Sequence, residues 1–150
     1  MRLARSRADA LTAVARIRAL QSRATEIEAV RAVNAHRAAT ERHESCAEAL
    51  AEIQTGWSEA LQGGSFDPGM ARYWYAALDR GCAEERQLAE LVEAARDRLE
   101  QDRAAWHAAS ARSDAAREQA QAASKRLARQ REEIRLAALE DRAARGTRPS

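Results

Sequence analysis

The chain has 150 residues and a formal net charge of +2, with 45% hydrophobic residues but only 4% aromatic ones. Alanine accounts for about a quarter of the residues, and charged side chains make up 32%. Abundant Ala, Glu, Arg and Leu with few aromatic residues is typical of long helices or coiled coils. Too few large apolar side chains are present to fill the core of one globular domain of this length.

Further classes of protein are disfavoured by the absence of their signals. No apolar run approaches the roughly 20 residues that span a bilayer, and no secretory signal is visible. The Arg-rich start superficially suits a transit peptide, but its periodicity continues into the following residues without a cleavage-like break. Cys46 and Cys82 form no close-spaced pair, which favours a reducing cytoplasm over a disulfide framework. Of the 25 basic residues only Lys125 is a lysine, and this bias alone does not indicate nucleic-acid binding.

Residues from about 6 to 61 are expected to form one long helix. The stretch has no proline and a single glycine, Gly56, among strong helix formers. Near its end the apolar residues Cys46, Leu50, Ile53 and Trp57 recur in steps of four and three. Towards the start of the helix the same register continues through Ala39, His36 and Ala32. Closer to the start the apolar positions keep spacings of three and seven in a shifted register: Leu11, Val14, Ile17, Leu20, Ile27 and Val30.

A turn is expected at about residues 62–69, where "GGSFDPG" gathers half of the chain's glycine and proline residues. Asp67 is suited to cap a second helix that has Pro68 at its first position. That second helix is expected over about 70–145, followed by a short disordered tail at 146–150. A short connector between two helices usually makes them antiparallel neighbours.

The second helix carries a sustained heptad pattern, which is the kind of seam that winds helices together. Glu85, Asp102 and Gln130 are poor seam residues, and the seam consists largely of alanine from 109 to 123. The seam of the two helices together is predicted to contain these residues: Leu50, Ile53, Trp57, Trp74, Leu78, Leu88, Val92, Leu99, Trp106, Leu127 and Ile134.

The predicted fold is therefore all-α, a long two-helix antiparallel coiled-coil hairpin. Folding at the turn pairs residues whose numbers add up to about 131, so Trp57 faces Trp74 and Ala39 faces Val92. The first residue then lies near position 130. The last fifteen or so residues are expected to continue past it as a single helix.

Charge is distributed unevenly along the chain. Residues 1–25 have a net charge of +5 and residues 112–148 of +4, whereas residues 26–62 have −4, Asp67 adds −1, and residues 72–103 have −2. In a hairpin the two basic segments lie side by side, giving one end of about +9 and a turn end of about −7. Two interpretations remain open: a chance imbalance between solvated faces, or a basic end that docks on an acidic surface.

No arrangement of residues indicates catalysis, a metal or a cofactor. The glycines of the turn lack the Lys-Ser/Thr ending of a phosphate-binding loop. His36 and His43 are seven residues apart on one helix, and His107 lies on the other, so no metal site is expected. The hairpin brings Cys46 and Cys82 within about one helical turn, and free thiols are favoured over a disulfide between them. The sequence therefore predicts a protein that is not an enzyme.

Tyr73, Trp74 and Tyr75 are the densest aromatic cluster. Because neighbouring residues are about 100° apart around a helix, a seam position for Trp74 points Tyr73 and Tyr75 partly outward. Exposed aromatic side chains are frequent at protein contacts. A partner contact and packing around the turn are equally compatible with this pattern.

Three stretches resemble the FliJ family, the small component of the flagellar type III export apparatus, and its YscO-type injectisome relatives. "LTAVARIRALQSRATEIEAVRA" is similar to the opening helix of that family, and "RLEQDRAAWHAASARSDAAREQA" places Trp106 midway along the second helix, as the family often does. "REEIRLAALEDRAARGTRP" is similar to its ending, an acidic-apolar patch followed by spaced arginines. The resemblance spans nearly the whole chain.

The resemblance implies a non-catalytic protein similar to the central stalk of rotary ATPases, cytoplasmic and peripherally associated with the inner membrane. Its terminal end would insert into a hexameric export ATPase and promote its assembly. The protein would also contact the export-gate membrane protein, for which Tyr73 and Tyr75 are candidates, and escort export chaperones. The candidates for the ATPase contact are Arg5, Arg7, Arg16, Arg18, Arg126, Arg129, Arg131 and Arg135.

Two alternatives remain. The first is a general coiled-coil scaffold or adaptor, because a thin seam is often stabilised by a partner. The second is a nucleic-acid-binding protein that uses the basic end. Its affinity for DNA or RNA would fall steeply as the salt concentration rises, and no affinity at moderate salt would dismiss it.

Overall fold

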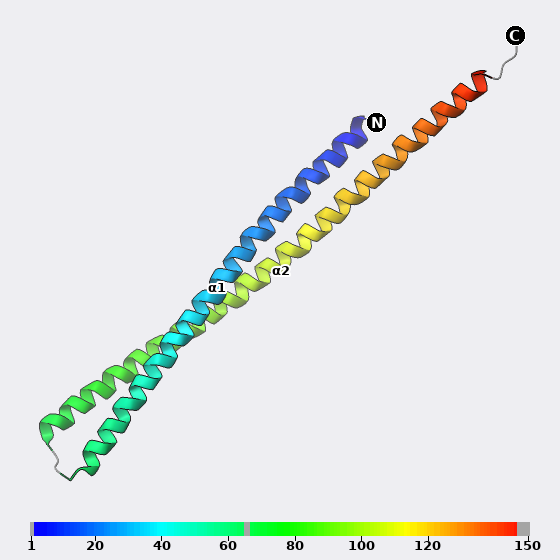
Figure 1. Ribbon diagram of the computed structural model, residues 1–150. Coiled ribbons are helices and arrows are strands. Elements are labelled where there is room, and N and C mark those ends of the chain that lie inside the picture. The colour runs from blue at the N-terminus through cyan, green and yellow to red at the C-terminus, as the bar shows by residue number, and fades with distance from the viewer. Residues whose placement is uncertain (1, 65–66, 147–150) are drawn as a thin grey trace. The chain divides into compact units, whose positions relative to one another are not determined.

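A computed structural model describes residues 2–64 and 67–146 and contains two long helices. Helix α1 spans Arg2–Gln62 and helix α2 spans Pro68–Gly146, and the described residues contain no strand. The two helices pack against each other as a hairpin, which confirms the predicted all-α fold class (Figure 1). Both helices extend a few residues beyond the predicted limits of 6–61 and 70–145. Most of the predicted tail, residues 147–150, lies outside the described residues.

The turn is formed by the residue types that its geometry requires. Gly63 donates a backbone hydrogen bond of 3.1 Å to the carbonyl of Glu59, and Gly64 has φ of 79°. This left-handed conformation after a helix favours glycine, which has no Cβ to clash. The Asp67 carboxylate accepts a hydrogen bond of 2.9 Å from the Gly69 amide, so Asp67 caps α2 with Pro68 at the first helical position.

The chain divides into two compact units. The turn unit consists of Glu26–Ala104 and contains the connection between the helices. The terminal unit consists of Met1–Thr25 and Ala105–Ser150. The turn unit has nine basic and sixteen acidic side chains, a formal net charge of −7. The terminal unit has sixteen basic and seven acidic side chains, a formal net charge of +9.

In the turn unit, the less exposed residues of each helix follow one another in steps of three and four. On α1 they include Ala29, Ala32, His36, Ala39, His43, Cys46, Leu50, Ile53 and Trp57, and on α2 Trp74, Leu78, Gly81, Glu85, Leu88, Val92, Ala95, Leu99 and Asp102. This is the heptad seam of a coiled coil. Leu99, only 7% exposed, is its most deeply buried large side chain.

The contacts of two glycines show which residues of α1 and α2 lie opposite each other. A Cβ added to Gly81 would lie 2.8 Å from Leu50 Cδ1, and one added to Gly56 would lie 2.7 Å from the Trp74 ring. The numbers of these two contacting pairs add up to 131 and 130, in agreement with the predicted sum of about 131. Each glycine therefore makes room for a large side chain from the opposite helix.

The acidic seam residues of the turn unit have partners. Glu85 Oε1 lies 2.7 Å from Nε2 of His43, across the seam. Asp102 accepts a hydrogen bond of 2.8 Å from Nε of Arg98, one turn earlier on the same helix. Partnering a carboxylate reduces the cost of its partial burial, which is why the seam tolerates these residues.

Alanine makes up half of the seam of the terminal unit. The less exposed residues again step by three and four: Ala4, Ala8, Leu11, Ala15, Arg18, Ser22 and Thr25 on α1, and Trp106, Ala109, Ser113, Ala116, Ala120, Ala123 and Leu127 on α2. Ala8 and Ala120 are 5% and 9% exposed. Alanine allows helices to approach closely but contributes little apolar area to burial.

The structure departs from the predicted register at the start of α1. Val14, Ile17 and Leu20 are 45%, 55% and 66% exposed, and Ile27 and Val30 of the turn unit are also exposed. The shift in register inferred from these large side chains is therefore wrong, because the seam continues in the original register through Leu11, Ala15, Arg18, Ser22 and Thr25.

Ile134 also lies off the seam, since it is 53% exposed. Helix α1 begins at Arg2, and Ala4 lies in the same groove as Leu127 and Gln130. The N-terminal end of α1 therefore lies beside α2 only as far as about Gln130, and Ile134 has no residue of α1 to pack against. Every side chain described from Ala128 to Arg145 is exposed, and α2 continues past the start of α1 (Figure 1).

We predict that Leu99→Ala lowers the free energy of unfolding by about 2 kcal/mol, because it removes a buried side chain and leaves a cavity. Leu91→Ala on the same helix removes an exposed side chain, 57% accessible, and should change stability by less than about 0.5 kcal/mol. Urea unfolding followed by circular dichroism measures both. Equal effects of the two substitutions would show that the seam is placed wrongly.

Candidate partner-binding surface

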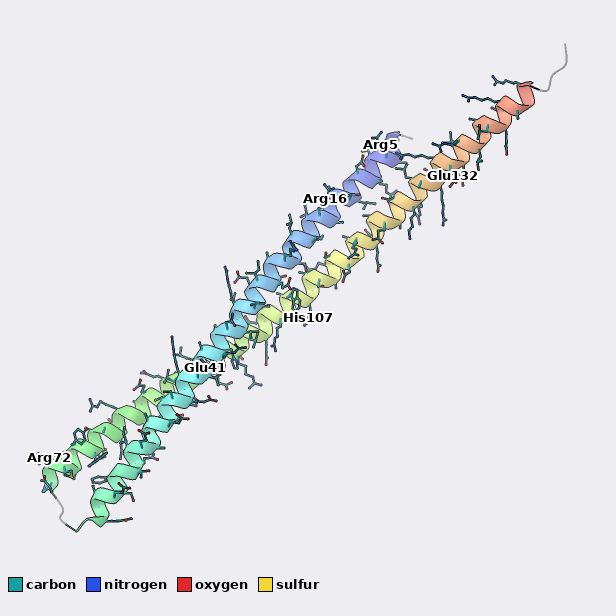
Figure 2. All side chains as sticks on the ribbon, viewed as in Figure 1. Arg5, Arg16, Glu41, Arg72, His107 and Glu132 are labelled. Carbon is teal, nitrogen blue, oxygen red and sulfur yellow. The ribbon has the colours of Figure 1, made fainter. Side chains whose placement is uncertain are left out.

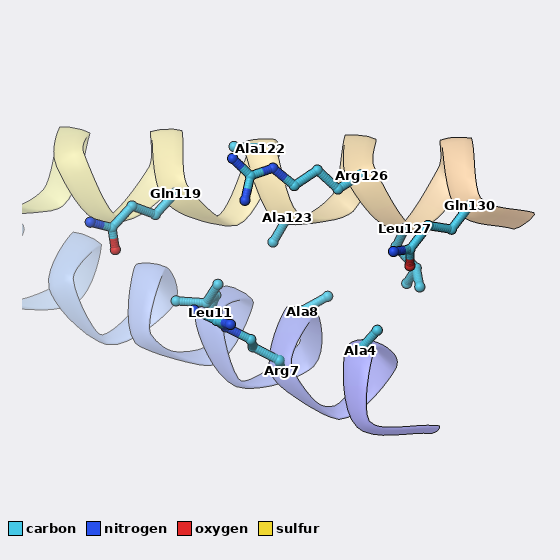
Figure 3. Close-up of a pocket in the computed structure, with 10 residues that line it drawn as sticks. All are labelled: Ala4, Arg7, Ala8, Leu11, Gln119, Ala122, Ala123, Arg126, Leu127 and Gln130. Atoms are coloured by element: carbon cyan, nitrogen blue, oxygen red, sulfur yellow. The ribbon is translucent and has the colours of Figure 1, made fainter. Parts of the chain in front are cut away.

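Three grooves run between the helices of the terminal unit. The Leu11 groove has a volume of about 480 Å³ and is lined by Ala4, Arg7, Ala8 and Leu11 of α1 and by Gln119, Ala122, Ala123, Arg126, Leu127 and Gln130 of α2. Figure 3 shows Ala4, Ala8, Leu11, Ala123 and Leu127 between the helices, with Arg7 on one helix and Arg126, beside Ala122, on the other.

The other two grooves have the same character. The Arg18 groove, of about 210 Å³, is lined by Arg18, Gln21, Thr25, Ala105, Ala108, Ala109 and Arg112. The Lys125 groove, of about 600 Å³, is lined by Thr12, Ala15, Arg16, Ala19, Ser113, Arg117, Ala120, Gln121, Ser124 and Lys125. All three have floors rich in alanine, and they are open because the seam alanines are too small to fill the space beside the helices.

The grooves of the terminal unit are basic. Among the residues that line them, all of which are described, at least two are Arg or Lys in each groove and none is Asp or Glu. By contrast, two grooves of the turn unit contain acidic residues: Glu41 and Glu84 in one, and Glu41 and Glu44 in the other. A cationic rim around an apolar floor favours ligands that combine negative charge with apolar surface.

The structure divides the arginines proposed for the ATPase contact into two groups. Arg7 and Arg126 share the Leu11 groove, while Arg16 and Arg18 each lie in a different groove. The remaining candidates are exposed and line none of the three grooves: Arg5, Arg129, Arg131 and Arg135. Figure 2 shows Arg5 and Arg16 on α1 of the terminal unit. Arg18 is half-buried, and its Nη1 donates a hydrogen bond of 3.0 Å to Gln21 Oε1.

Sequence reasoning missed Arg112, Arg117 and Lys125, which complete the cationic rims. Their signal was available in the heptad pattern: Arg112 and Arg117 each lie beside a seam position, at 113 and 116. Residues beside the seam of a two-helix coiled coil border its grooves. Net charge by segment, which identified the basic end, does not show which basic side chains border a groove.

Tyr73 and Tyr75 are 64% and 73% exposed, as expected from a seam position for Trp74. Tyr73 packs edge-to-face on Trp74, with ring centroids 5.6 Å apart. Trp74 is half-buried against Gly56. The Tyr75 side chain therefore offers the larger exposed aromatic surface of the two tyrosines.

Cys46 and Cys82 are half-buried free thiols. Cys46 lies in a groove with Glu84 and Leu88, and Cys82 does not line that groove. Partial burial, with the nearby carboxylates of Glu84 and Glu85, raises the pKa of the Cys46 thiol. Because the thiolate is the reactive form, a raised pKa makes this cysteine less reactive.

Within residues 2–64 and 67–146, no three His, Cys, Asp or Glu side chains gather in a way that would bind a metal ion. Neither helix, over its described length, contains a segment apolar enough to cross a membrane.

Comparison of the chain with protein-family models, curated proteins and solved structures gave no match.

We predict that Glu84→Gln, in a chain with Cys82→Ser, accelerates alkylation of Cys46 by iodoacetamide at pH 8. Removing the carboxylate lowers the thiol pKa and increases the thiolate fraction. The control is Glu90→Gln, an exposed residue of the same helix, which should leave the rate unchanged. Mass spectrometry at timed intervals measures the rates, and a slower reaction in Glu84→Gln would contradict the assignment.

Proposed function

We propose that this chain is a non-catalytic stalk of a type III export apparatus, flagellar or of the injectisome type. Its terminal unit would dock in a hexameric export ATPase and promote assembly of the ring. The resemblance of three long stretches to the FliJ family supports the proposal, and so does the two-helix hairpin fold. The protein would work at the cytoplasmic side of the inner membrane without inserting into it and without binding nucleic acid.

The observation that carries this proposal is the separation of charge. The terminal unit has a net charge of +9 and the turn unit −7. Long-range attraction of a strongly basic end accelerates its encounter with an acidic surface and orients it. An acidic opening in an ATPase ring is a surface of that kind.

The turn unit would make the remaining contacts. Tyr73 and Tyr75 are exposed near the turn and are candidates for contact with the export-gate membrane protein. Aromatic side chains contribute strongly to protein interfaces because they bury a large area with few rotatable bonds. Escort of export chaperones completes the proposed role, for which the resemblance is the only support.

We predict that the protein increases both the ATPase rate and the ring assembly of its cognate export ATPase. Replacing Arg126, Arg129 and Arg131 with Glu should abolish both effects, because it reverses the charge of exposed side chains of the terminal unit. The rate is measured by phosphate release, and ring size by light scattering after size-exclusion chromatography.

A matched variant separates the site from total charge. Replacing Arg37, Arg72 and Arg86 of the turn unit with Glu changes the net charge equally and should preserve activation. Circular dichroism confirms that both variants remain helical. Loss of activation in both variants, or in neither, would contradict docking through the terminal unit, and an unstimulated ATPase would remove the stalk proposal.

A further inference from the structure

The Leu11 groove and the Arg18 groove lie on one side of the terminal unit. Arg112 lines the second groove, Gln119 and Arg126 line the first, and these three residues are seven apart along α2. On α1 the corresponding residues are Arg7 and Gln21, fourteen apart. Residues seven apart in a coiled coil lie on the same side of the helix. The two grooves therefore follow one another along the same face.

The floor of this face is mostly apolar but includes the half-buried Arg18, and the exposed Arg7, Arg112 and Arg126 lie along its edges. Val14 lies seven residues after Arg7 and seven before Gln21, and its side chain is 45% exposed, so it adds apolar surface between the two grooves. The groove floors contribute alanine methyl groups together with Leu11 and Leu127. The face extends along α1 from Ala4 to Thr25, about 30 Å at 1.5 Å per residue.

An α-helix fits this face. A straight trough between two packed helices with small side chains accepts the ridge of a third helix at close distance. About twenty residues of helix would match its length. A nucleic-acid backbone would leave the alanine and leucine floor without apolar partners.

The charges determine what kind of helix it is. Arg7, Arg18, Arg112 and Arg126 line the two grooves without any acidic residue among the lining side chains. Glu or Asp flanking an apolar stripe would therefore find only opposite charge at the edges. The terminal unit of a second copy is excluded as the occupant by its own net charge of +9, which would be repelled.

We propose that this face, here called the helix-docking face, binds an acidic amphipathic α-helix of a partner protein and forms a three-helix bundle with the terminal unit. This assigns a binding site along the side of the terminal unit, independent of the export-ATPase proposal. The partner helix would bury its apolar stripe on the alanine floor and place carboxylates beside the four arginines.

Binding is measured with the full chain and a fluorescent synthetic peptide of about three heptads, with Leu at two positions of each heptad and Glu flanking them. A twin peptide has Lys in place of every Glu. We expect the Glu peptide to bind at least about tenfold more tightly than the Lys peptide at about 50 mM salt, and to weaken as salt rises. Fluorescence anisotropy gives both affinities.

Two pairs of variants place the peptide on the chain. The double variant R7E/R126E should lose at least about tenfold in affinity, whereas R23E/R142E, with the same change in net charge on the same two helices, should retain it. Ala122→Trp fills the Leu11 groove at an exposed position and should block binding. Ala128→Trp, also exposed but lining none of the three grooves, should not.

Several results would overturn the proposal: equal affinity for the two peptides, no saturable binding of the Glu peptide, or equal loss in both charge-reversal pairs. Self-association that R7E/R126E abolishes, seen in analytical ultracentrifugation, would show that a second copy occupies the face. Duplex DNA binding that depends on the same arginines and on Ala122 would identify nucleic acid instead. ATPase activation is absent from all these readouts, so the stalk proposal stands or fails separately.

Discussion

The packing of the two helices along a heptad seam is the constraint on which the rest of the structure depends. In the turn unit the seam includes large residues such as Leu99 and Trp74, and glycines at 56 and 81 make room for facing side chains. In the terminal unit half of the seam residues are alanine, and Ala8 and Ala120 are buried. Alanine brings the helix backbones together but buries little area. One consequence is that larger apolar side chains remain outside, and another is that open grooves border the seam.

Much of the fold follows from the sequence because the turn residues are so concentrated. Once the chain reverses at Gly64 and Asp67, the position of the turn sets the pairing of every later residue, as the Leu50–Gly81 contact illustrates. The prediction failed where residue size was taken as the guide to burial. Val14, Ile17 and Leu20 are more apolar than Ala15, Arg18 and Ser22, which lie on the seam instead, but a register shift would have broken the helix pairing maintained by the rest of the hairpin. Ile134 continues the heptad pattern of α2, but it lies past the N-terminal end of α1 and so has no partner helix to pack against.

The candidate site was only partly accessible to sequence reasoning. Net charge along the chain identified two basic segments, because charge is additive, and the predicted hairpin placed them at one end. The grooves depend on which small residues face one another, and that information appears only when both helices are placed. Arg7 and Arg126 illustrate the difference: both were candidates as basic residues near the ends, but their shared groove is a property of the pairing. The grooves add a defined arrangement of basic side chains around an apolar floor, and a partner protein would recognise that arrangement.

The central claim is that the chain reverses once, so that the start of α1 lies against α2. Spin labels on cysteines introduced at Asp9 and Gln121, with both native cysteines replaced by serine, test it most directly by double electron–electron resonance. Both positions are exposed and belong to the terminal unit. With the labelled protein diluted in unlabelled chain, packed helices predict a distance of about 20 Å, from the 8–10 Å between helix axes and the label linkers. A single unbent helix would separate these positions by about 170 Å and give no measurable coupling, which would contradict the account.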